Sequence, residues 1–205
     1  MYRTSDEKWG EILKTIADLH QQQRPVLVGT RSVEASEKLS GLLTEKGLPH
    51  KVLNARQDKE EAEIISLAGQ AASITVATNM AGRGTDIRLG PGVAELGGLH
   101  VIASERHEAG RIDRQLFGRC GRQGDPGAGE AFVSLDDELI TVHVWKSLRW
   151  LAEGTSGTFF GKWLGRVLFG RAQRGAQRLH ARMRHNLLKM DEQLSESLAF
   201  SGRSE

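Results

Sequence analysis

The sequence predicts an α/β fold, with a parallel sheet flanked by helices and a helical extension at the C-terminal end. Three observations support this prediction: short apolar runs alternate with segments of helical periodicity, the connections are short, and the alternation stops after residue 138. Because short strand–helix–strand connections are right-handed, the alternation favours parallel strands. We therefore expect an α/β domain at residues 1–138 and a basic, tryptophan-containing helical part at residues 139–205.

In the first half of the chain, helices and strands alternate. The expected helices span residues 5–23, 30–46 and 58–67, and the expected strands span residues 26–29, 48–54 and 73–78. Apolar residues recur three and four positions apart in the helices, and each strand is a short apolar run. Ser5 is the expected N-cap of the first helix, and Thr30 or Ser32 that of the second, where Val33 should face the core. Gly47 ends the second helix, because glycine tolerates the left-handed conformation of a C-terminal cap.

The second half begins with the same alternation and then departs from it. We expect strands at residues 98–103 and 130–135, a helix at 108–117 and a surface loop at 88–97. Asp136 should cap a further helix whose first turn holds the acids that follow. From Arg171 onward, apolar residues recur three and four positions apart as far as Leu198, so a long helix is expected there.

The composition is that of an ordinary soluble protein. A chain of 205 residues can form one sizeable α/β domain with an extension, and a formal net charge of +2 gives no overall argument for nucleic acid. The single cysteine, Cys120, excludes an intrachain disulfide and suits a reducing compartment. It lies in a basic loop that could lower its pKa, but filling space is its expected role. No apolar run reaches the length of a membrane span, and residues 1–5 lack the core of a signal peptide, so we expect a cytoplasmic protein.

Two segments that combine glycine with arginine are the strongest functional signals. Residues 75–87 (TVATNMAGRGTDI) begin as a buried strand and continue as a glycine-dense loop, and residues 115–125 (QLFGRCGRQGD) hold two more arginines. Glycine lets backbone approach a ligand closely, and the arginine fork matches phosphate oxygens. Each segment could instead be a tight turn with solvated arginines, but the ordered pair predicts one half of a phosphate-binding cleft. Ligands of parallel sheets bind beyond the carboxyl ends of the strands, so both segments are expected there.

The other parts of a nucleotide site are not found in the sequence. No segment has the form G-x-x-x-x-G-K-[ST], and residues 157–163 imitate it with the wrong spacing. The acids at residues 136–138 come after the arginine-rich segment and are expected to begin a helix rather than hold magnesium. The seven histidines show no convincing ligand spacing, so no metal site is predicted. Such a chain would supply positive charge to a nucleotide held mainly by another domain, as arginine fingers do.

Several segments closely resemble the second nucleotide-binding domain of SecA, the ATPase motor of bacterial preprotein export. They are, in order, residues 26–34 (VLVGTRSVE), 52–56 (VLNAR), 77–86 (ATNMAGRGTD), 97–102 (GGLHVI), 104–108 (SERHE) and 115–125. The resemblance covers residues 20–140, and residues 171–190 are more faintly similar to the start of the family's long scaffold helix. It implies a RecA-like fold of the helicase C-terminal type, acting as the second motor domain of a protein-translocating ATPase.

The resemblance also implies roles for individual residues. Arg119 and Arg122 would be arginine fingers on the phosphates of ATP, with Arg122 the main finger for the γ-phosphate. The residues implied to meet the nucleotide are Gly82, Arg83, Gly84, Thr85 and Asp86 of motif V, and Gln115, Gly118 and Gly121 of motif VI.

Partners follow from the same resemblance. ATP with Mg²⁺ would bind in the complete motor, whose first nucleotide-binding domain holds the phosphate loop, and no cofactor is expected on this chain alone. The other implied partners are a preprotein, the translocation channel and an anionic membrane surface. The implied location is therefore cytoplasmic and peripheral to the inner membrane.

Residues 139–170 do not match the family pattern and leave alternatives open. Between residues 139 and 190 there are ten Lys or Arg residues, one acid and three tryptophans. The aromatic side chains could pack on the rest of the protein, or the segment could contact anionic lipid or the channel. One half of a nucleic-acid helicase and a non-catalytic docking module are the competing functions, although the motif V string disfavours a nucleic-acid partner.

Overall fold

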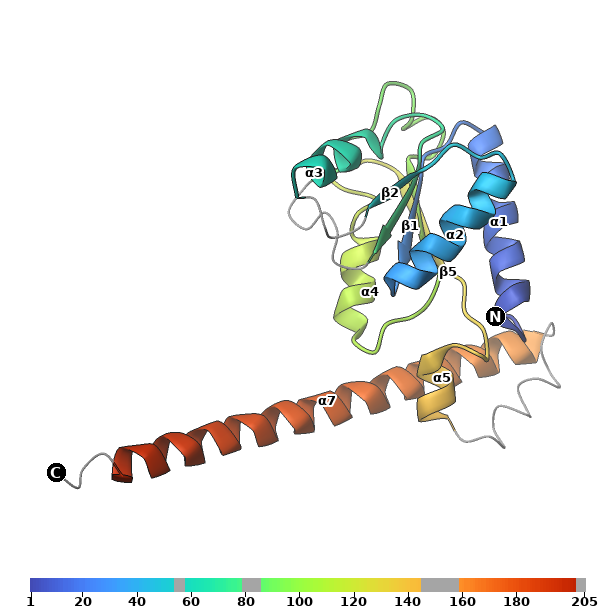
Figure 1. Cartoon of the computed structure of the whole chain (residues 1–205). Coiled ribbons are helices and arrows are strands. Elements are labelled where there is room, and N and C mark those ends of the chain that lie inside the picture. The colour runs from blue at the N-terminus through green and yellow to red at the C-terminus, as the bar shows by residue number, and fades with distance from the viewer. Residues whose placement is uncertain (54–57, 79–85, 145–158, 202–205) are drawn as a thin grey trace.

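The α/β domain is built on a five-stranded parallel sheet (Figure 1). The computed structural model describes residues 1–53, 58–78, 86–144 and 159–201. The strands, in the spatial order β2-β3-β1-β4-β5, are β1 (Val26–Thr30), β2 (Lys51–Leu53), β3 (Ile74–Thr78), β4 (Leu99–Ala103) and β5 (Gly127–Ala131). Each neighbouring pair is parallel. The predicted α/β class with a parallel sheet is confirmed.

Helices cover both faces of the sheet. On one face lie α1 (Ser5–Gln21) and α2 (Val33–Glu45), and on the other lie α3 (Asp58–Leu67) and α4 (Gly110–Phe117) (Figure 1). Successive side chains of a strand point to opposite faces, so Val26 and Val28 join the core under α1 and α2, whereas Leu27 joins the other core. All residues of β1 and β3 are buried, which explains why these strands are continuous apolar runs in the sequence.

The caps of the first two helices differ in part from the prediction. Thr4, not Ser5, caps α1, and its hydroxyl accepts a hydrogen bond from the backbone N of Glu7 at 3.3 Å. Ser32 caps α2 by accepting from the backbone N of Ala35 at 3.1 Å. The expectation that Val33 faces the core is wrong: it is 42% exposed, because the buried face of α2 begins one turn later, at Ser36.

The last strand, β5, also begins and ends earlier in the chain than predicted. β5 spans residues 127–131 because β4 pairs Leu99 with Gly127 and Ala103 with Ala131, which leaves residues 132–135 beyond the strand. The next helix, α5 (Glu138–His143), has Asp137 rather than Asp136 at its N-cap. Asp136 instead accepts a hydrogen bond from the backbone N of Ser5 at 3.0 Å, so it fastens the start of α1.

The C-terminal part is dominated by one long helix, α7 (Phe159–Ser201), which begins before the predicted start at Arg171. Among its described side chains, those that pack in a core lie in the first half of the helix. Leu168, Phe169, Ala172 and Ala176 form a separate core with Leu135 and the buried residues of α5. The later apolar positions are exposed, namely Leu179, Met183, Leu187, Met190 and Leu194. Figure 1 shows α7 extending away from the α/β domain, so its apolar periodicity correctly predicted a helix but not a buried face.

The aromatic residues of the basic segment can be followed only in part. Phe169 is 6% exposed and packs in the core between α5 and α7, which agrees with the packing alternative for this residue. The side chains of Trp145, Trp150 and Trp163 lie outside the described part of the structure. Whether these tryptophans contact lipid stays a prediction.

A buried ion pair joins α1 to the beginning of the C-terminal part. Lys8 is 1% exposed, and its Nζ lies 2.5 Å from Oδ1 of Asp137 and 3.8 Å from Oε1 of Glu105. Asp137 also accepts hydrogen bonds from the backbone N and the hydroxyl of Ser134. Because loss of Lys8 or Asp137 would leave a buried charge without its nearest counter-charge, these contacts hold α1 against the turn that precedes α5.

Two glycines let α4 lie close to the sheet. A Cβ on Gly29 of β1 would be 2.4 Å from Cδ2 of Leu116, and a Cβ on Gly129 of β5 would be 2.7 Å from Cδ1 of Phe117. Real side chains cannot approach this closely, so any larger residue would push α4 outward or force Leu116 or Phe117 into another rotamer. The two glycines therefore set the height of α4 above the sheet.

Gly29→Ala should lower the free energy of unfolding by about 1–3 kcal/mol, the usual cost of overpacking a core. Gly41 in the middle of α2 is the matched control, because a Cβ there would meet no atom within 4 Å. Gly41→Ala should leave stability unchanged or raise it by up to about 1 kcal/mol, because it removes a helix-interior glycine. Urea unfolding of the three proteins measures both changes. Equal stabilities for the two variants would contradict the close approach of α4.

Candidate nucleotide-phosphate site

The second glycine–arginine segment lies at the amino end of the sheet, not at the carboxyl end. β4 ends at Ala103, and its parallel neighbour β5 begins at Gly127, so the helix between them has to run back antiparallel to both strands. The segment that follows α4 is therefore carried to the beginning of β5, where a Cβ on Gly127 would lie 2.7 Å from the backbone N of Gly121. The expectation that residues 115–125 sit beyond the carboxyl ends of the strands is wrong for this geometric reason.

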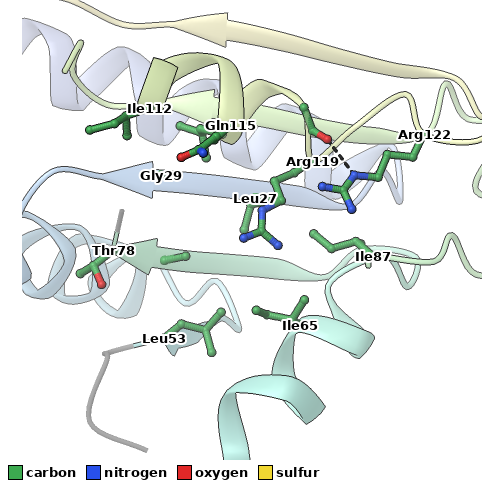
Figure 2. Close-up of a pocket in the computed structure, with 13 residues that line it drawn as sticks. Leu27, Gly29, Leu53, Ile65, Thr78, Ile87, Ile112, Gln115, Arg119 and Arg122 are labelled. Atoms are coloured by element: carbon green, nitrogen blue, oxygen red, sulfur yellow. Dashed lines mark hydrogen bonds between the residues drawn. The ribbon is translucent and has the colours of Figure 1, made fainter. Parts of the chain in front are cut away.

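Arg119 and Arg122 line one cavity of about 300 Å³ on the face of the sheet between α3 and α4 (Figure 2). Both reach into it from the C-terminal end of α4, and Gln115 and Gly118 of the same segment also line it. The remaining lining comes from β1, β2, β3, α3, α4 and the residue after motif V, namely Leu27, Gly29, Leu53, Ala77, Thr78, Ile65, Ile112, Leu116 and Ile87. The cavity therefore combines guanidinium groups with apolar walls.

Arg122 connects the two glycine–arginine segments directly. Its Nη1 donates to Oδ1 of Asp86 at 2.8 Å, and its Nε donates to the carbonyl oxygen of Gly118 at 2.7 Å (the dashed line in Figure 2). The neighbouring Gln123 donates to the other carboxylate oxygen of Asp86 at 3.1 Å. Arg122 and Asp86 are 40% and 36% exposed, so solvent weakens this ion pair, and a phosphate group could compete with Asp86 for the guanidinium.

The structure describes the predicted site residues unevenly. It brings together Asp86, Gln115, Gly118, Arg119 and Arg122. The other motif V residues, Gly82, Arg83, Gly84 and Thr85, lie outside the described residues. Gly121 does not line the cavity. It has a φ of +66° and turns the chain after α4, which is a conformation that glycine adopts without strain.

Cys120 fills space behind the arginines, as expected. Its Sγ donates to the carbonyl oxygens of Phe117 and Ala128 at 3.2 and 3.5 Å. The suggestion that the basic loop lowers the pKa of this thiol is wrong: burial raises the pKa, and this outweighs the opposing effects of a backbone hydrogen bond and of Arg24. A thiol in this environment is a poor nucleophile.

Sequence reasoning missed a polar network at the other end of α4. Asp113 is 3% exposed, and its Oδ1 accepts from the backbone N and lies 2.9 Å from Nδ1 of His107. Its Oδ2 accepts from Nε2 of Gln173 on α7 at 2.8 Å, and Gln173 also donates to the carbonyl oxygen of His107. The network ties α4 to α7. The signal in the sequence was an aspartate at a position where α4 should be buried, but its partner on α7 is far away in the chain.

The pKa of Asp113 is lowered in the folded protein. Burial raises the pKa, but the hydrogen bonds from His107 and Gln173 outweigh burial. A carboxyl group whose folded pKa lies below its unfolded value stabilises the fold above the unfolded pKa of about 3.9, and this stabilisation is lost as the pH falls through the folded pKa.

Asp113→Asn should therefore destabilise the protein by about 2–3 kcal/mol near neutral pH, because several hydrogen bonds to a charged acceptor are lost. The difference from the wild type should shrink below about pH 4. Urea unfolding at pH 7, 5 and 3 tests this. Asp18→Asn, at an exposed position of α1, is the control and should stay within about 0.5 kcal/mol of the wild type. A penalty for Asp113→Asn that does not change with pH would contradict the role of the charge.

Two absences limit the chemistry of the described residues. Within them, no three His, Cys, Asp or Glu side chains are grouped closely enough to hold a metal ion. No helix in the same part of the chain is both long and apolar enough to cross a membrane. Among the residues that line the first cavity, the charged side chains are those of Arg119 and Arg122.

A five-stranded parallel sheet covered by helices on both faces is a fold of the helicase-domain type. The fold is similar to that of the E. coli DEAD-box protein SrmB, with a TM-score of 0.55, 22% identity and coverage of 68% of this chain and 77% of that chain. Domain 2 of the DEAD-box helicase Mss116p gives the same TM-score at 16% identity, over 68% of this chain and 55% of that chain. At these identities the similarity shows the fold alone.

The family follows from the sequence comparisons. A family model described as the SecA P-loop domain matches residues 1–94 and 91–153, so the chain belongs to the SecA family. It is 49% identical over 199 residues to protein translocase subunit SecA 2 of Nitrosospira multiformis, covering 97% of this chain and 30% of that protein. It is 59% identical over 140 residues to protein translocase subunit SecA of Oleidesulfovibrio alaskensis, covering 68% of this chain and 16% of that protein. The chain thus spans less than a third of the length of these relatives.

Proposed function

We propose that this chain is the second motor domain of a SecA-type ATPase that drives protein translocation across the bacterial inner membrane. Residues 1–138 form the motor domain in this proposal, and residues 139–205 form a helical, basic, tryptophan-containing appendage that ends in a long helix. ATP and Mg²⁺ are held by the first nucleotide-binding domain of the complete motor, and this chain contributes arginines to the phosphates. The proposal rests on family membership and on the sequence, which contains no phosphate loop.

The observation that carries the proposal is the contact between Arg122 and Asp86. It places a motif VI arginine on a motif V carboxylate, beside a cavity that Arg119 also lines. Nη2 of Arg122 has no hydrogen-bond partner among the described residues. A γ-phosphate would compete with Asp86 for this guanidinium, so nucleotide binding would change the connection between the two segments. Such exchange is a direct way to couple nucleotide to domain movement.

The proposed partners are a preprotein, the translocation channel and an anionic membrane surface. The related proteins are named protein translocase subunits, which supports the first two. Support for the membrane surface comes from composition: ten basic residues and one acid lie between residues 139 and 190. The protein would accordingly be cytoplasmic and peripheral to the inner membrane. A helicase half is the competing proposal, and stimulation of the complete ATPase by RNA but not by preprotein would favour it.

The isolated chain should not turn over ATP, because it supplies arginines but no phosphate loop. Purified protein with ATP and Mg²⁺ should release phosphate at the background rate, measured with a coupled phosphate assay. The Arg122→Ala variant serves as the control for contaminating ATPases. Turnover on the order of one per second that disappears in this variant would overturn the two-domain proposal.

In the complete ATPase, Arg122→Lys should reduce turnover on the order of a thousandfold, because a point charge cannot replace the planar guanidinium fork. Arg119→Lys should also reduce it. Asp86→Asn should have a smaller effect on turnover, because the carboxylate holds the finger and does not meet the transferred phosphate. Arg171→Lys, at an exposed position of α7 away from the cavity, is the matched control. Near-normal turnover of Arg122→Lys would show that Arg122 is structural.

A further inference from the structure

A second cavity, between α4 and α7, has positive charge that its surroundings do not neutralise. It has a volume of about 780 Å³ and is lined by four arginines, of which Arg31 comes from the end of β1, Arg111 and Arg114 from α4, and Arg184 from α7. The guanidinium groups of Arg111, Arg114 and Arg184 form no hydrogen bond or ion pair with any described residue. Three guanidinium groups on two helices therefore converge on one space without a counter-ion.

The acidic side chain in this cavity is already paired. Glu108 accepts a hydrogen bond from Nη2 of Arg31 at 3.2 Å, and its other carboxylate oxygen is bound to Nε2 of His180 on α7. Arg31 also pairs with Glu138 of α5 at 2.9 Å. The four arginines face the two carboxylates of Glu108 and Glu138, so with neutral histidines four positive charges against two negative ones leave a surplus of two, and both carboxylates are bound to Arg31 rather than to the other three arginines.

The beginning of α4 adds backbone donors next to the cavity, which Ala109 and Arg111 line and Gly110 adjoins. Its N-cap residue, Ala109, lines the cavity and makes no side-chain capping hydrogen bond. The backbone N–H groups of Gly110 and Arg111 have no partner among the described residues. Gly110 lies against α7, since a Cβ there would be 3.3 Å from the amide groups of both Gln173 and Gln177. An uncapped helix start with free N–H groups favours an anion.

His107 provides an independent indication of a ligand. It lines the cavity, it is 4% exposed, and its Nε2 is buried without a hydrogen-bond partner among the described residues. Its Nδ1 is committed to Asp113 at 2.9 Å. When the ring carries two protons, Nε2 can donate to an anionic oxygen, which would satisfy a polar atom whose burial otherwise costs free energy.

We propose that this cavity binds the phosphate groups of a small polyphosphate and that the bound anion clamps α4 to α7. A carboxylate would neutralise one of the three arginines, whereas a pyrophosphate-sized anion matches all three and can accept paired hydrogen bonds from each fork. Because Arg119 and Arg122 lie at the opposite end of α4, the clamp would hold the helix that carries the proposed fingers. The proposal does not depend on the proposed function.

Inorganic pyrophosphate is the probe. Titration calorimetry on the wild-type chain should detect binding that weakens as salt rises. The double substitution Arg114→Gln, Arg184→Gln should weaken it at least tenfold, because hydrogen bonds to charged groups are removed. Arg171→Gln changes the same charge on the same helix outside the cavity and should bind like the wild type. Absence of pyrophosphate binding to the wild type would overturn the proposal. Equal binding by the double variant would also overturn it.

Two further arms locate the anion and identify its source. In the double variant Arg119→Gln, Arg122→Gln, pyrophosphate should still bind this second cavity with wild-type affinity, as followed by the resonances described next; a loss of that binding would assign the anion to the first cavity and overturn the proposal. Backbone amide resonances of Gly110 and Arg111 should shift on titration, which a general charge effect would not confine to these residues. Vesicles of phosphatidylglycerol distinguish a lipid headgroup from a free anion. Vesicle binding that requires Arg114 and Arg184, without pyrophosphate binding, would assign the cavity to a lipid phosphate and overturn the proposal of a small polyphosphate.

Discussion

The close contact between α4 and the sheet determines where the candidate sites can form. Gly29 and Gly129 bring Leu116 and Phe117 down onto β1 and β5, and the parallel pairing of β4 with β5 determines the direction of the helix. One end of α4 therefore lies at the carboxyl end of the sheet and the other at the amino end. Two groups of arginines, near each end of one short helix, are the result of this single packing arrangement.

The start of α4 is joined to α7 by hydrogen bonds rather than by apolar packing. Gln173 bonds both Asp113 and the backbone of His107, and His180 bonds Glu108 about two turns further along α7. The apolar core of the C-terminal part instead joins α7 to α5, and Lys8 joins α5 to α1. Polar contacts exchange partners more readily than a packed core does, because each lost hydrogen bond can be replaced by one to water or to a ligand. The polar contact between α4 and α7 can therefore change partners more readily than the apolar contact between α5 and α7.

Local patterns in the sequence predicted the elements well, and long-range contacts limited the rest. The apolar runs at β1 and β3 and the periodicities of α1 and α2 are local, so the α/β class followed from them. The start of β5 depends on its register with β4, and Asp136 and Asp137 exchange roles because Ser5 and Lys8 contact them from the other end of the chain. In the candidate site, residue types identified Arg119 and Arg122, but their position at the amino end of the sheet depends on the path of α4. The contact between Asp113 and Gln173 could not be predicted either, because the two residues are 60 positions apart in the sequence.

The length of α7 gives it a mechanical property that its sequence alone does not suggest. Its last described contact with the α/β domain is at His180, and the helix continues to Ser201. These final residues extend about 30 Å at 1.5 Å per residue, so a rotation of about 10° at the base would displace the tip by about 5 Å. The helix thus behaves as a lever arm: a sub-ångström change in the contacts of Gln173 or His180 would be magnified into a movement several times larger at its far end.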